Sequence, residues 1–266
     1  MTQLPGTLAA HPRRQRQLLE EHHGPFNKVS RNPPSHILPP YSLTSLTALR
    51  DFSLPTVSTP PRTPLPFFHL IERLKTTPRE GWRRFPDINR VESISDHMYR
   101  MSIITMLAPP SVTEGLDIPH CTKMALVHDM AESLVGDITP QDGVPKEEKM
   151  RRESDAMDYL CDTLLGAWGG GNQGQEIKRI FLEYEEGTTE ESKFVHDVDK
   201  IELLLQMIEY ERRGEGDVDL VEFLPTAERI RGEGVKAWAR EILEERDMFW
   251  RDVHARRDSL GNDEAT

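Results

Sequence analysis

The chain has 266 residues and 36% hydrophobic content, enough for a sizeable core, and its two cysteines form no CxxC motif. This composition excludes a small disulfide-stapled scaffold and favours a reducing compartment. The net charge of −12 becomes −16 over residues 66–266, because residues 1–65 carry seven Lys or Arg against three Asp or Glu. Such an acidic domain disfavours a nucleic-acid polymer as partner, because that binding relies on many Lys and Arg contacts to phosphates.

Residues 1–64 are predicted to be a disordered, Pro-rich extension. Twelve of the 20 prolines lie within residues 1–66, and no helical or strand period is sustained there. Glu20 and Glu21 follow the early arginines, which disfavours a mitochondrial transit peptide. No run of 18 apolar residues predicts a membrane span. We therefore expect a soluble protein with no membrane contact, located in the cytoplasm, with the nucleus as an alternative.

The rest of the chain is predicted to be one all-α domain over residues 65–255, followed by a disordered tail over 256–266. Apolar residues recur at helical spacing, Pro or Gly separates the segments, and no alternating stretch predicts a strand. The sequence SISD, which begins at Ser93, is typical of a helix start. Helices are expected near residues 66–76, 94–107, 118–134, 147–167, 174–185, 189–213, 219–231 and 233–250.

The segment ALVHDMAESLVGD, residues 125–137, places polar groups within the apolar stripe of the helix expected over 118–134. Side chains three and four positions apart share a helix face, so Glu132 is expected near both His128 and Asp129. His128 lies among apolar neighbours on this face and is expected to point inward. A single inward histidine is more often a core residue bonded to the backbone. The segment therefore indicates a site only in combination with other inward polar residues.

Two further helices carry residues of this kind. His97 shares a face with apolar residues, and Asp197 and Asp199 lie in a segment that is apolar on more than one side. The helical wheel does not choose between the two aspartates. Together, these groups on three helices supply mixed nitrogen and oxygen ligands, which suit a divalent cation. Buried carboxylates without such a partner would be costly.

These residues resemble the H…HD…D signature of the HD-domain metal-dependent phosphohydrolases, and the resemblance is closer to their 5′-deoxynucleotidase branch. It is carried, over roughly residues 66–250, by GWRRF, VESISDHMYRMS, ALVHDMAESLVGDITP, VPKEEKMRRE and FLEYEE…KFVHDVDKIE. The resemblance implies an HD-domain helical fold, a divalent cation (Mn²⁺, Co²⁺, Mg²⁺ or Zn²⁺) and Glu132 as the catalytic glutamate. The metal ligands that it implies are His97, His128, Asp129 and Asp199. It selects Asp199 over Asp197, because the family's aspartate precedes a polar residue and an IE-like pair.

The resemblance also implies substrate contacts. Asp137 matches an acidic residue near the nucleoside sugar, and Trp82 matches a tryptophan beside the deoxyribose, where crowding disfavours a 2′-hydroxyl. The family's phosphate-binding arginine directly precedes that tryptophan, but Gly81 stands there in this chain. Arg79 and Arg83 are therefore alternative phosphate-binding residues, because a guanidinium matches phosphate oxygens in pairs.

The function implied is metal-dependent hydrolysis of 2′-deoxynucleoside 5′-monophosphates to deoxynucleoside and phosphate. The same ligand set serves HD-type phosphodiesterases and nucleotide pyrophosphohydrolases. A non-catalytic regulatory scaffold with a structural metal is a further alternative. The glycine-rich segment GGGNQG, residues 169–174, lacks the Lys-Ser/Thr pair of a P-loop, so it predicts no phosphate site. Relatives of this kind tend to be dimeric, so the resemblance also implies a homodimer.

Overall fold

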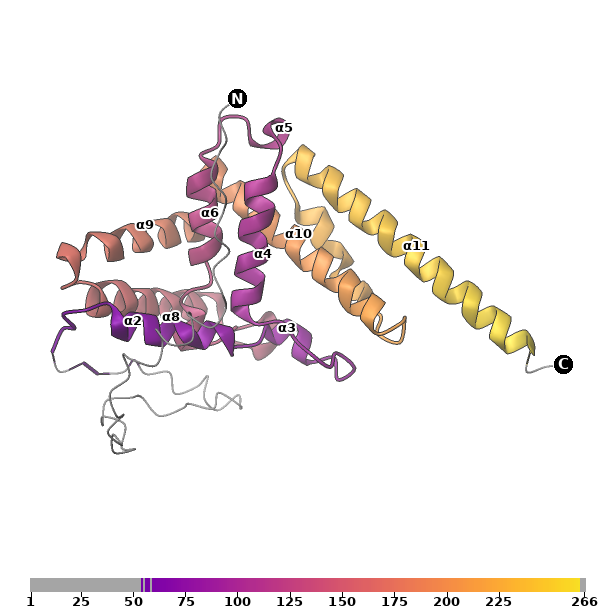
Figure 1. The fold of residues 1–266 in the computed structure, drawn as a ribbon, viewed down its shortest axis with the longest axis horizontal. Coiled ribbons are helices and arrows are strands. Elements are labelled where there is room, and N and C mark those ends of the chain that lie inside the picture. Colours follow the sequence, from indigo (N-terminus) through magenta and orange to yellow (C-terminus); the bar gives the residue numbers. More distant parts are fainter. Residues whose placement is uncertain (1–53, 55, 58, 264–266) are drawn as a thin grey trace, which may run out of the picture. The chain divides into compact units, whose positions relative to one another are not determined.

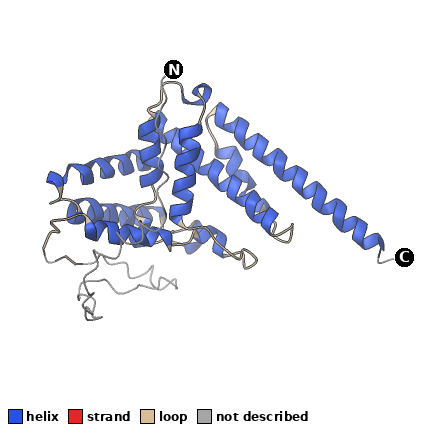
Figure 2. Ribbon diagram, viewed as in Figure 1, coloured by secondary structure: helices blue, strands red, loops and turns tan. Residues whose placement is uncertain are grey.

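The computed structural model describes residues 54, 56–57 and 59–263, and for residues 260–263 it describes the backbone only. Most of the extension predicted over residues 1–64 therefore lies outside the described residues. No residue in the described part belongs to a β-strand (Figure 2), which confirms the all-α class. No helix in that part is both long enough and apolar enough to cross a membrane.

The helical elements follow one another through short connections (Figure 1). The elements between residues 65 and 186 are α2 (Leu65–Ile71), η1 (Glu72–Lys75), α3 (Glu80–Arg83), α4 (Ile94–Leu107), α5 (Pro110–Thr113), α6 (Ile118–Val127), α7 (Glu132–Val135), η2 (Pro140–Asp142), α8 (Lys146–Asp158), the π-helical turn η3 (Tyr159–Leu164), η4 (Gly169–Gly171) and α9 (Asn172–Glu186). The remaining three are α10 (Glu190–Arg213), the 3₁₀ segment η5 (Val221–Arg229) and α11 (Glu233–Asp263).

Helix α10 lies at the centre of the packing. It contacts α4, α6, α9, η5 and α11, and α4 packs along α6 (Figure 1). Its buried side chains include Val195, Val198, Leu204 and Met207. Each such aliphatic side chain contributes roughly 1.5–3 kcal/mol on full burial. Because α10 is covered on several sides, polar residues on its inner faces meet α4 and the segment that follows α6.

Helix α4 begins at the residue that the sequence predicted. The Ser93 hydroxyl accepts the backbone N–H of Asp96, and the Asp96 carboxylate accepts the backbone N–H of Ser93. This reciprocal cap satisfies two N–H groups that a helix start leaves without partners. An isolated antiparallel bridge joins Pro78 to Ser93, so the loop that carries α3 returns to the start of α4. The cap and the bridge together bring the residues after Pro78 next to the start of the helix that carries His97.

The prediction of one continuous helix over residues 118–134 is wrong, because the helix is interrupted in the middle of this range. Helix α6 ends at Val127, and α7 begins only at Glu132. Between them the backbone N–H of Met130 bonds to Val127 O, and that of Glu132 bonds to Asp129 O. Hydrogen bonds between residues three apart wind the chain more tightly than an α-helix does. No glycine or proline stands at this break, so apolar periodicity alone could not reveal it.

Helix α11 is longer than the predicted 233–250. Residues 256–263, which we predicted as part of a disordered tail, are helical. The guanidinium of Arg246 pairs with both Glu211 oxygens at 2.8 and 2.9 Å, and Trp250 Nε1 donates to the same carboxylate at 3.0 Å. Farther along, Arg257 donates to Gly216 O at 3.0 Å. These long-range contacts tie α11 to the end of α10, which local sequence patterns do not report.

Candidate metal centre and active site

A cavity of about 570 Å³ opens beside the break between α6 and α7. Residues of α3, η2, α8, α9, α10 and η5 also line it. We call it the acidic cavity, because its lining includes the carboxylates of Asp129, Glu132, Asp137, Glu153, Glu185, Asp199 and Glu222. So many acids around one space repel one another, which favours the binding of positive charge between them.

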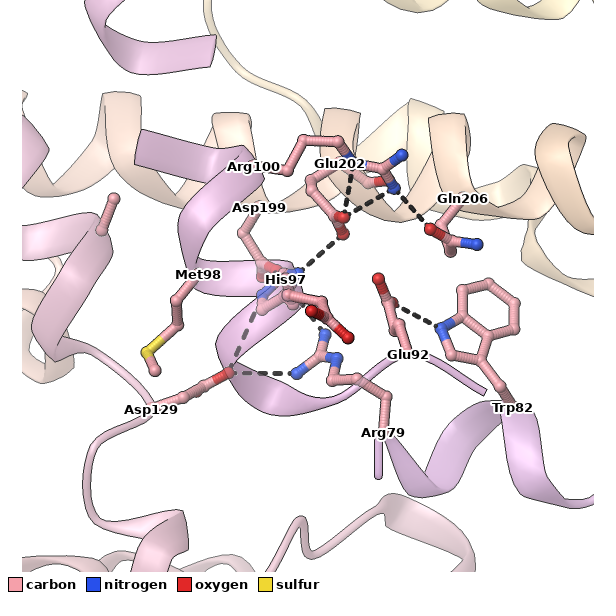
Figure 3. Close-up of polar contacts among 12 residues, drawn as sticks. Arg79, Trp82, Glu92, His97, Met98, Arg100, Asp129, Asp199, Glu202 and Gln206 are labelled. Carbon is pink, nitrogen blue, oxygen red and sulfur yellow. Dashed lines mark hydrogen bonds and ion pairs between the residues drawn. The ribbon is translucent and has the colours of Figure 1, made fainter. Parts of the chain in front are cut away.

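His97 lies deep in this region and is 0% exposed. Its Nδ1 lies 2.6 Å from Glu202 Oε2, while its Nε2 lies 3.3 Å from Asp199 Oδ1 and 3.7 Å from Asp129 Oδ2 (Figure 3). Nε2 makes no hydrogen bond of ordinary geometry with any described residue. Burial and Arg79 oppose protonation of the ring, but Glu202 and Asp199 outweigh both and raise the pKa of His97 to about 10. The ring therefore presents an unpartnered nitrogen to two carboxylates.

His128, like His97, points its Nε2 atom toward Asp129. Its Nδ1 lies 3.0 Å from Ala125 O, and a carbonyl only accepts, so Nδ1 carries the proton of the neutral ring. Nε2 lies 3.2 Å from Asp129 Oδ2. Although burial acts in the opposite direction, His128 and then Arg79 lower the pKa of Asp129. The turn after α6 thus brings an ionised carboxylate next to the imidazole of the preceding residue.

Helix α10 places its two candidate aspartates in different surroundings. Asp199 lines the acidic cavity, with Oδ1 3.3 Å from His97 Nε2. Asp197 is 2% exposed, and its Oδ2 accepts the backbone N–H groups of Arg231 at 2.9 Å and Gly232 at 2.7 Å. Asp197 therefore holds the segment that leads into α11. Asp199 is the aspartate of this helix that the structure brings to His97.

The donor set at this point fits a divalent cation. The ligand atoms of His97, His128 and Asp129 lie within 4.8 Å of one another, and Asp199 adjoins them. Two imidazole nitrogens and two carboxylates suit Mn²⁺, Fe²⁺, Co²⁺ or Zn²⁺. A cation here would give His97 Nε2 a partner and would offset the charge of the carboxylates. The structure thus brings together all four residues that the sequence predicted as ligands.

Arg79 enters the cluster from the loop before α3. Its backbone N–H donates to Glu92 O at 3.0 Å, which places it beside the start of α4. Its Nη1 lies 3.1 Å from Asp129 Oδ2 and its Nη2 lies 3.8 Å from Asp199 Oδ1 (Figure 3). Burial opposes the positive charge, but Asp137 and the other two aspartates outweigh it and raise the pKa of Arg79 well above its usual value. A permanently charged guanidinium thus adjoins the predicted metal ligands.

Glu132 is the first residue of α7, Asp137 follows the turn after α7, and both line the acidic cavity. Glu132 is 2% exposed, and its Oε2 has no hydrogen-bond partner among the described residues. Burial, and then repulsion by Asp129 and Asp137, raises the pKa of Glu132 well above its usual value. Asp137 accepts the backbone N–H of Glu80 at 2.8 Å. Gly136, with φ of +76°, makes the turn between α7 and Asp137, and this conformation favours glycine.

Trp82 lines the acidic cavity, although its side chain is almost fully buried. It is 3% exposed, and its Nε1 donates to Glu92 Oε1 at 2.9 Å. Its ring packs edge-on against Tyr210, with ring centroids 5.3 Å apart, and its centroid lies 4.5 Å from that of the Phe223 ring. These contacts on three sides hold the indole in one orientation. Trp82 can therefore shape the cavity sterically, while its polar atom is already bonded.

The arginines near Trp82 differ in whether they lie at the predicted metal ligands. Arg83 pairs with Glu80 at 2.8 Å, is 45% exposed in its side chain and does not line the acidic cavity. Arg84 lines the cavity and pairs with Glu222 at 2.7 Å. Of the two arginines that the sequence left as alternatives, Arg79 lies at the predicted ligands and Arg83 does not.

Sequence reasoning missed three residues near the cluster. Glu202 contacts His97, Tyr184 lies with its ring centroid 4.8 Å from that of His128, and Lys149 lines the acidic cavity. Glu202 could have been found, because it is an acid within the apolar run IELLL of the helix expected over 189–213. Tyr184 and Lys149 reach the site only through the packing of α8 and α9, for which the sequence gives no local signal.

The fold and this cluster define a protein of the HD-domain class. The HD domain family matches residues 71–238, more than half of the chain, so the chain belongs to that family. The matched range includes all of the predicted metal ligands and Glu132.

Curated relatives resemble the chain over most of their length. The 5′-deoxynucleotidase hdd1 of Schizosaccharomyces pombe is 47% identical over 194 residues, which cover 73% of this chain and 95% of that protein. The 5′-deoxynucleotidase YGK1 of Saccharomyces cerevisiae is 43% identical over 190 residues, 71% of this chain and 86% of that protein. The solved structure of HD domain-containing protein YGK1 has a TM-score of 0.57 at 35% identity, covering 77% of this chain and 94% of that chain. The similarity therefore extends over most of the chain and is not limited to short motifs.

Proposed function

We propose that the acidic cavity is the active site of a metal-dependent 5′-deoxynucleotidase, which hydrolyses 2′-deoxynucleoside 5′-monophosphates to deoxynucleoside and phosphate. The observation that carries this proposal is the convergence of two imidazole Nε2 atoms and two carboxylates beside Arg79: His128, Asp129 and Asp199 line the acidic cavity together with Glu132, and His97 lies buried behind the two aspartates. The relatives named 5′-deoxynucleotidase, at 43–47% identity, support the same substrate class.

The proposed metal ligands are His97, His128, Asp129 and Asp199. When bound, a divalent cation polarises the phosphate and lowers the pKa of water, so that a nucleophile forms near neutral pH. Mn²⁺, Co²⁺, Mg²⁺ and Zn²⁺ are the candidates. The two nitrogen donors favour the transition metals over Mg²⁺, which prefers oxygen ligands.

Arg79 is the proposed phosphate-binding residue. Its guanidinium already lies 3.1 Å from Asp129, so a phosphate held at the ligands would be within its reach. Two parallel N–H groups of an arginine match two phosphate oxygens. Lys149 lines the same cavity and adds a second positive charge. Arg83, which pairs with Glu80 outside the cavity, is not required for this role.

Glu132 is the proposed proton-transfer group. In the reaction the oxygen of a water molecule bonds to phosphorus, the bond between phosphorus and O5′ breaks, and O5′ gains one proton. Glu132 is a buried carboxylate in the cavity wall with an unpartnered oxygen, so it can accept a proton from the attacking water and deliver one to O5′. Positioned proton transfer of this kind typically contributes about 10²–10⁴-fold to the rate.

Trp82 and Asp137 are proposed to enclose the deoxyribose. Trp82 is fixed by its bond to Glu92, so its ring cannot withdraw to admit a 2′-hydroxyl. Asp137 keeps an acceptor at the cavity wall while it holds the backbone of Glu80. This arrangement accounts for a preference for deoxynucleotides by steric exclusion.

A phosphate-release assay tests the proposal. The metal-stripped full chain is given Mn²⁺, Co²⁺, Mg²⁺ or Zn²⁺ in turn, with a panel of ribo- and deoxynucleoside 5′-monophosphates and, in separate reactions, a cyclic dinucleotide and a nucleoside triphosphate. We expect phosphate from the deoxynucleotides, less from the ribonucleotides and none without metal. Turnover of a cyclic dinucleotide or a nucleoside triphosphate, with no phosphate from any deoxynucleoside monophosphate, would replace the proposal by a phosphodiesterase or pyrophosphohydrolase.

A homodimer and a cytoplasmic location are further proposals, which the resemblance and the composition support. Sedimentation of the purified full chain tests the first, and microscopy of the tagged full chain tests the second.

A further inference from the structure

We propose that Glu202 is a positioning residue for the metal centre: it holds a proton on Nδ1 of His97 and thereby leaves Nε2 free to bind the cation. Arg100 determines which oxygen of Glu202 does this. The inference rests on the proposed metal centre and adds two residues, neither of which is itself a proposed ligand.

The contact between Glu202 and His97 is fully enclosed. Both residues are 0% exposed, and Glu202 Oε2 lies 2.6 Å from His97 Nδ1 (Figure 3). An ionised carboxylate only accepts hydrogen bonds, so Nδ1 keeps its proton when a cation takes the place of the proton on Nε2. The lone pair is then on Nε2, which lies 3.3 Å from Asp199 Oδ1. Partners of this kind orient the histidine ligands of metal sites.

Arg100 occupies the other oxygen of Glu202. Its Nε lies 2.8 Å and its Nη2 lies 2.6 Å from Oε1. Its Nη1 donates to Glu209 at 2.8 Å, and its Nη2 donates to Gln206 at 2.7 Å, so side chains of α10 hold the guanidinium in place. Hydrogen bonds between charged groups are roughly twice as strong as neutral ones. The two oxygens of Glu202 therefore have distinct partners, Arg100 at Oε1 and His97 at Oε2.

Glu92, His97 and Glu202 also bring ligand atoms within 4.8 Å of one another, but their contacts disfavour a second metal. The 2.6 Å separation of His97 Nδ1 and Glu202 Oε2 is a hydrogen bond and leaves no space for an ion. Glu92 Oε1 accepts from Trp82 Nε1, and the guanidinium of Arg100 adds positive charge at Glu202. This cluster orients the imidazole and does not bind an ion.

Replacing Glu202 by glutamine tests the position of the proton. A glutamine side chain has one accepting oxygen and one donating NH₂ group. The two N–H groups of Arg100 attract the oxygen, so the NH₂ group faces His97 and donates to Nδ1. The ring proton then moves to Nε2, which cannot bind a cation while it carries a proton. We expect Glu202→Gln to weaken Mn²⁺ binding about 10- to 100-fold, as measured by calorimetric titration of the metal-stripped full chain.

Arg100 provides the second part of the test. In an Arg100→Leu background no guanidinium attracts the amide oxygen, so the introduced glutamine can turn that oxygen toward His97 Nδ1. Adding Glu202→Gln to Arg100→Leu is then expected to change the Mn²⁺ affinity by less than about threefold.

Glu209→Gln is the matched control, because Glu209 also pairs with Arg100 from α10 and has no contact with His97. It is expected to bind Mn²⁺ as tightly as the unchanged chain.

Two results overturn the inference: unchanged Mn²⁺ affinity in Glu202→Gln, or an equal loss in both Arg100 backgrounds. The ¹⁵N spectrum of the unchanged chain with Zn²⁺ bound is a second readout. It is expected to show a protonated Nδ1 and a metal-bound Nε2 on His97, and a metal-bound Nδ1 overturns the inference even if Glu202→Gln does not fold. If the unchanged chain binds neither Mn²⁺ nor Zn²⁺, the proposed metal centre fails as well, whereas loss of phosphatase activity alone leaves the assignment of Glu202 intact.

Discussion

Asp197 and Asp199 are two residues apart on α10 and have different partners. Asp199 Oδ1 lies 3.3 Å from His97 Nε2, whereas Asp197 Oδ2 accepts the backbone N–H groups of Arg231 and Gly232. The pair is therefore a matched test, because the same substitution on one helix acts on the metal centre in one case and on the start of α11 in the other.

We expect Asp199→Asn to weaken Mn²⁺ binding by more than about 100-fold, because loss of a ligand exceeds the 10- to 100-fold cost of losing a partner of a ligand. Bound metal stabilises the folded state, so Mn²⁺ is expected to raise the Tm of the unchanged chain and not that of Asp199→Asn. Asp197→Asn is expected to keep the Mn²⁺-dependent rise in Tm and to lose roughly 1 kcal/mol of stability. Equal Mn²⁺ responses of the two variants would contradict the assignment of Asp199.

Glu132→Gln separates proton transfer from metal binding. The amide has nearly the shape of the carboxylate but cannot accept or deliver a proton in this role. We expect kcat for deoxynucleoside monophosphates to fall about 10²–10⁴-fold, with Mn²⁺ affinity within about threefold of the unchanged chain. Steady-state kinetics and calorimetric titration measure the two quantities. A variant that keeps its kcat would remove Glu132 from the mechanism.

Arg79→Ala and Arg83→Ala test which arginine binds phosphate. Arg79 is half-buried against Asp129, whereas Arg83 pairs with Glu80 at the surface. Arg79→Ala is expected to lower kcat/KM by about 10- to 150-fold, because loss of a hydrogen bond to a charged group costs about 1.5–3 kcal/mol. Arg83→Ala is expected to stay within about twofold, because exposed ion pairs contribute little. The opposite order of the two variants would return the role to Arg83.

The sequence predicted the start of α4 from a local pattern, and the four candidate ligands from the order of motifs that the family shares. The cap formed by Ser93 and Asp96 marked the start of α4 correctly. The interruption after Val127 was not predictable, since it depends on hydrogen bonds between residues three apart and not on a helix-breaking residue. Sequence spacing also could not rank Arg79 against Arg83, because their positions follow from the pairing of Pro78 with Ser93. The partners of a candidate residue come from distant elements, and only the fold shows them.

Gly136→Ala is expected to destabilise the protein through its backbone alone. Gly136 has φ of +76° and ψ of 169°, which side chains with a Cβ rarely adopt, and no atom lies within 4 Å of the position that a Cβ would take. A strained conformation of this kind costs about 1–3 kcal/mol. Gly81→Ala is the control, since Gly81 lies in α3 with equal space around it, and alanine in a helix is expected to be neutral or favourable by up to about 1 kcal/mol. Urea unfolding of both variants measures the difference, and equal effects would show that the turn accepts a side chain.

Glu153 is expected to make the stability of the protein depend on pH. Burial raises the pKa of Glu153 from 4.5 to about 7, although Lys149 lies 3.6 Å away and acts in the opposite direction. Between these two pH values the folded state binds more protons than the unfolded state, so this group's contribution to the free energy of unfolding falls as the pH rises. The uncharged side chain of Glu153→Gln lacks this titration. From pH 5 to pH 8 we expect the unchanged chain to lose about 1–3 kcal/mol relative to Glu153→Gln. Urea unfolding at pH 5, 6, 7 and 8 checks the sign, and a constant difference between the two proteins would show that Glu153 titrates at its ordinary pKa in the folded state.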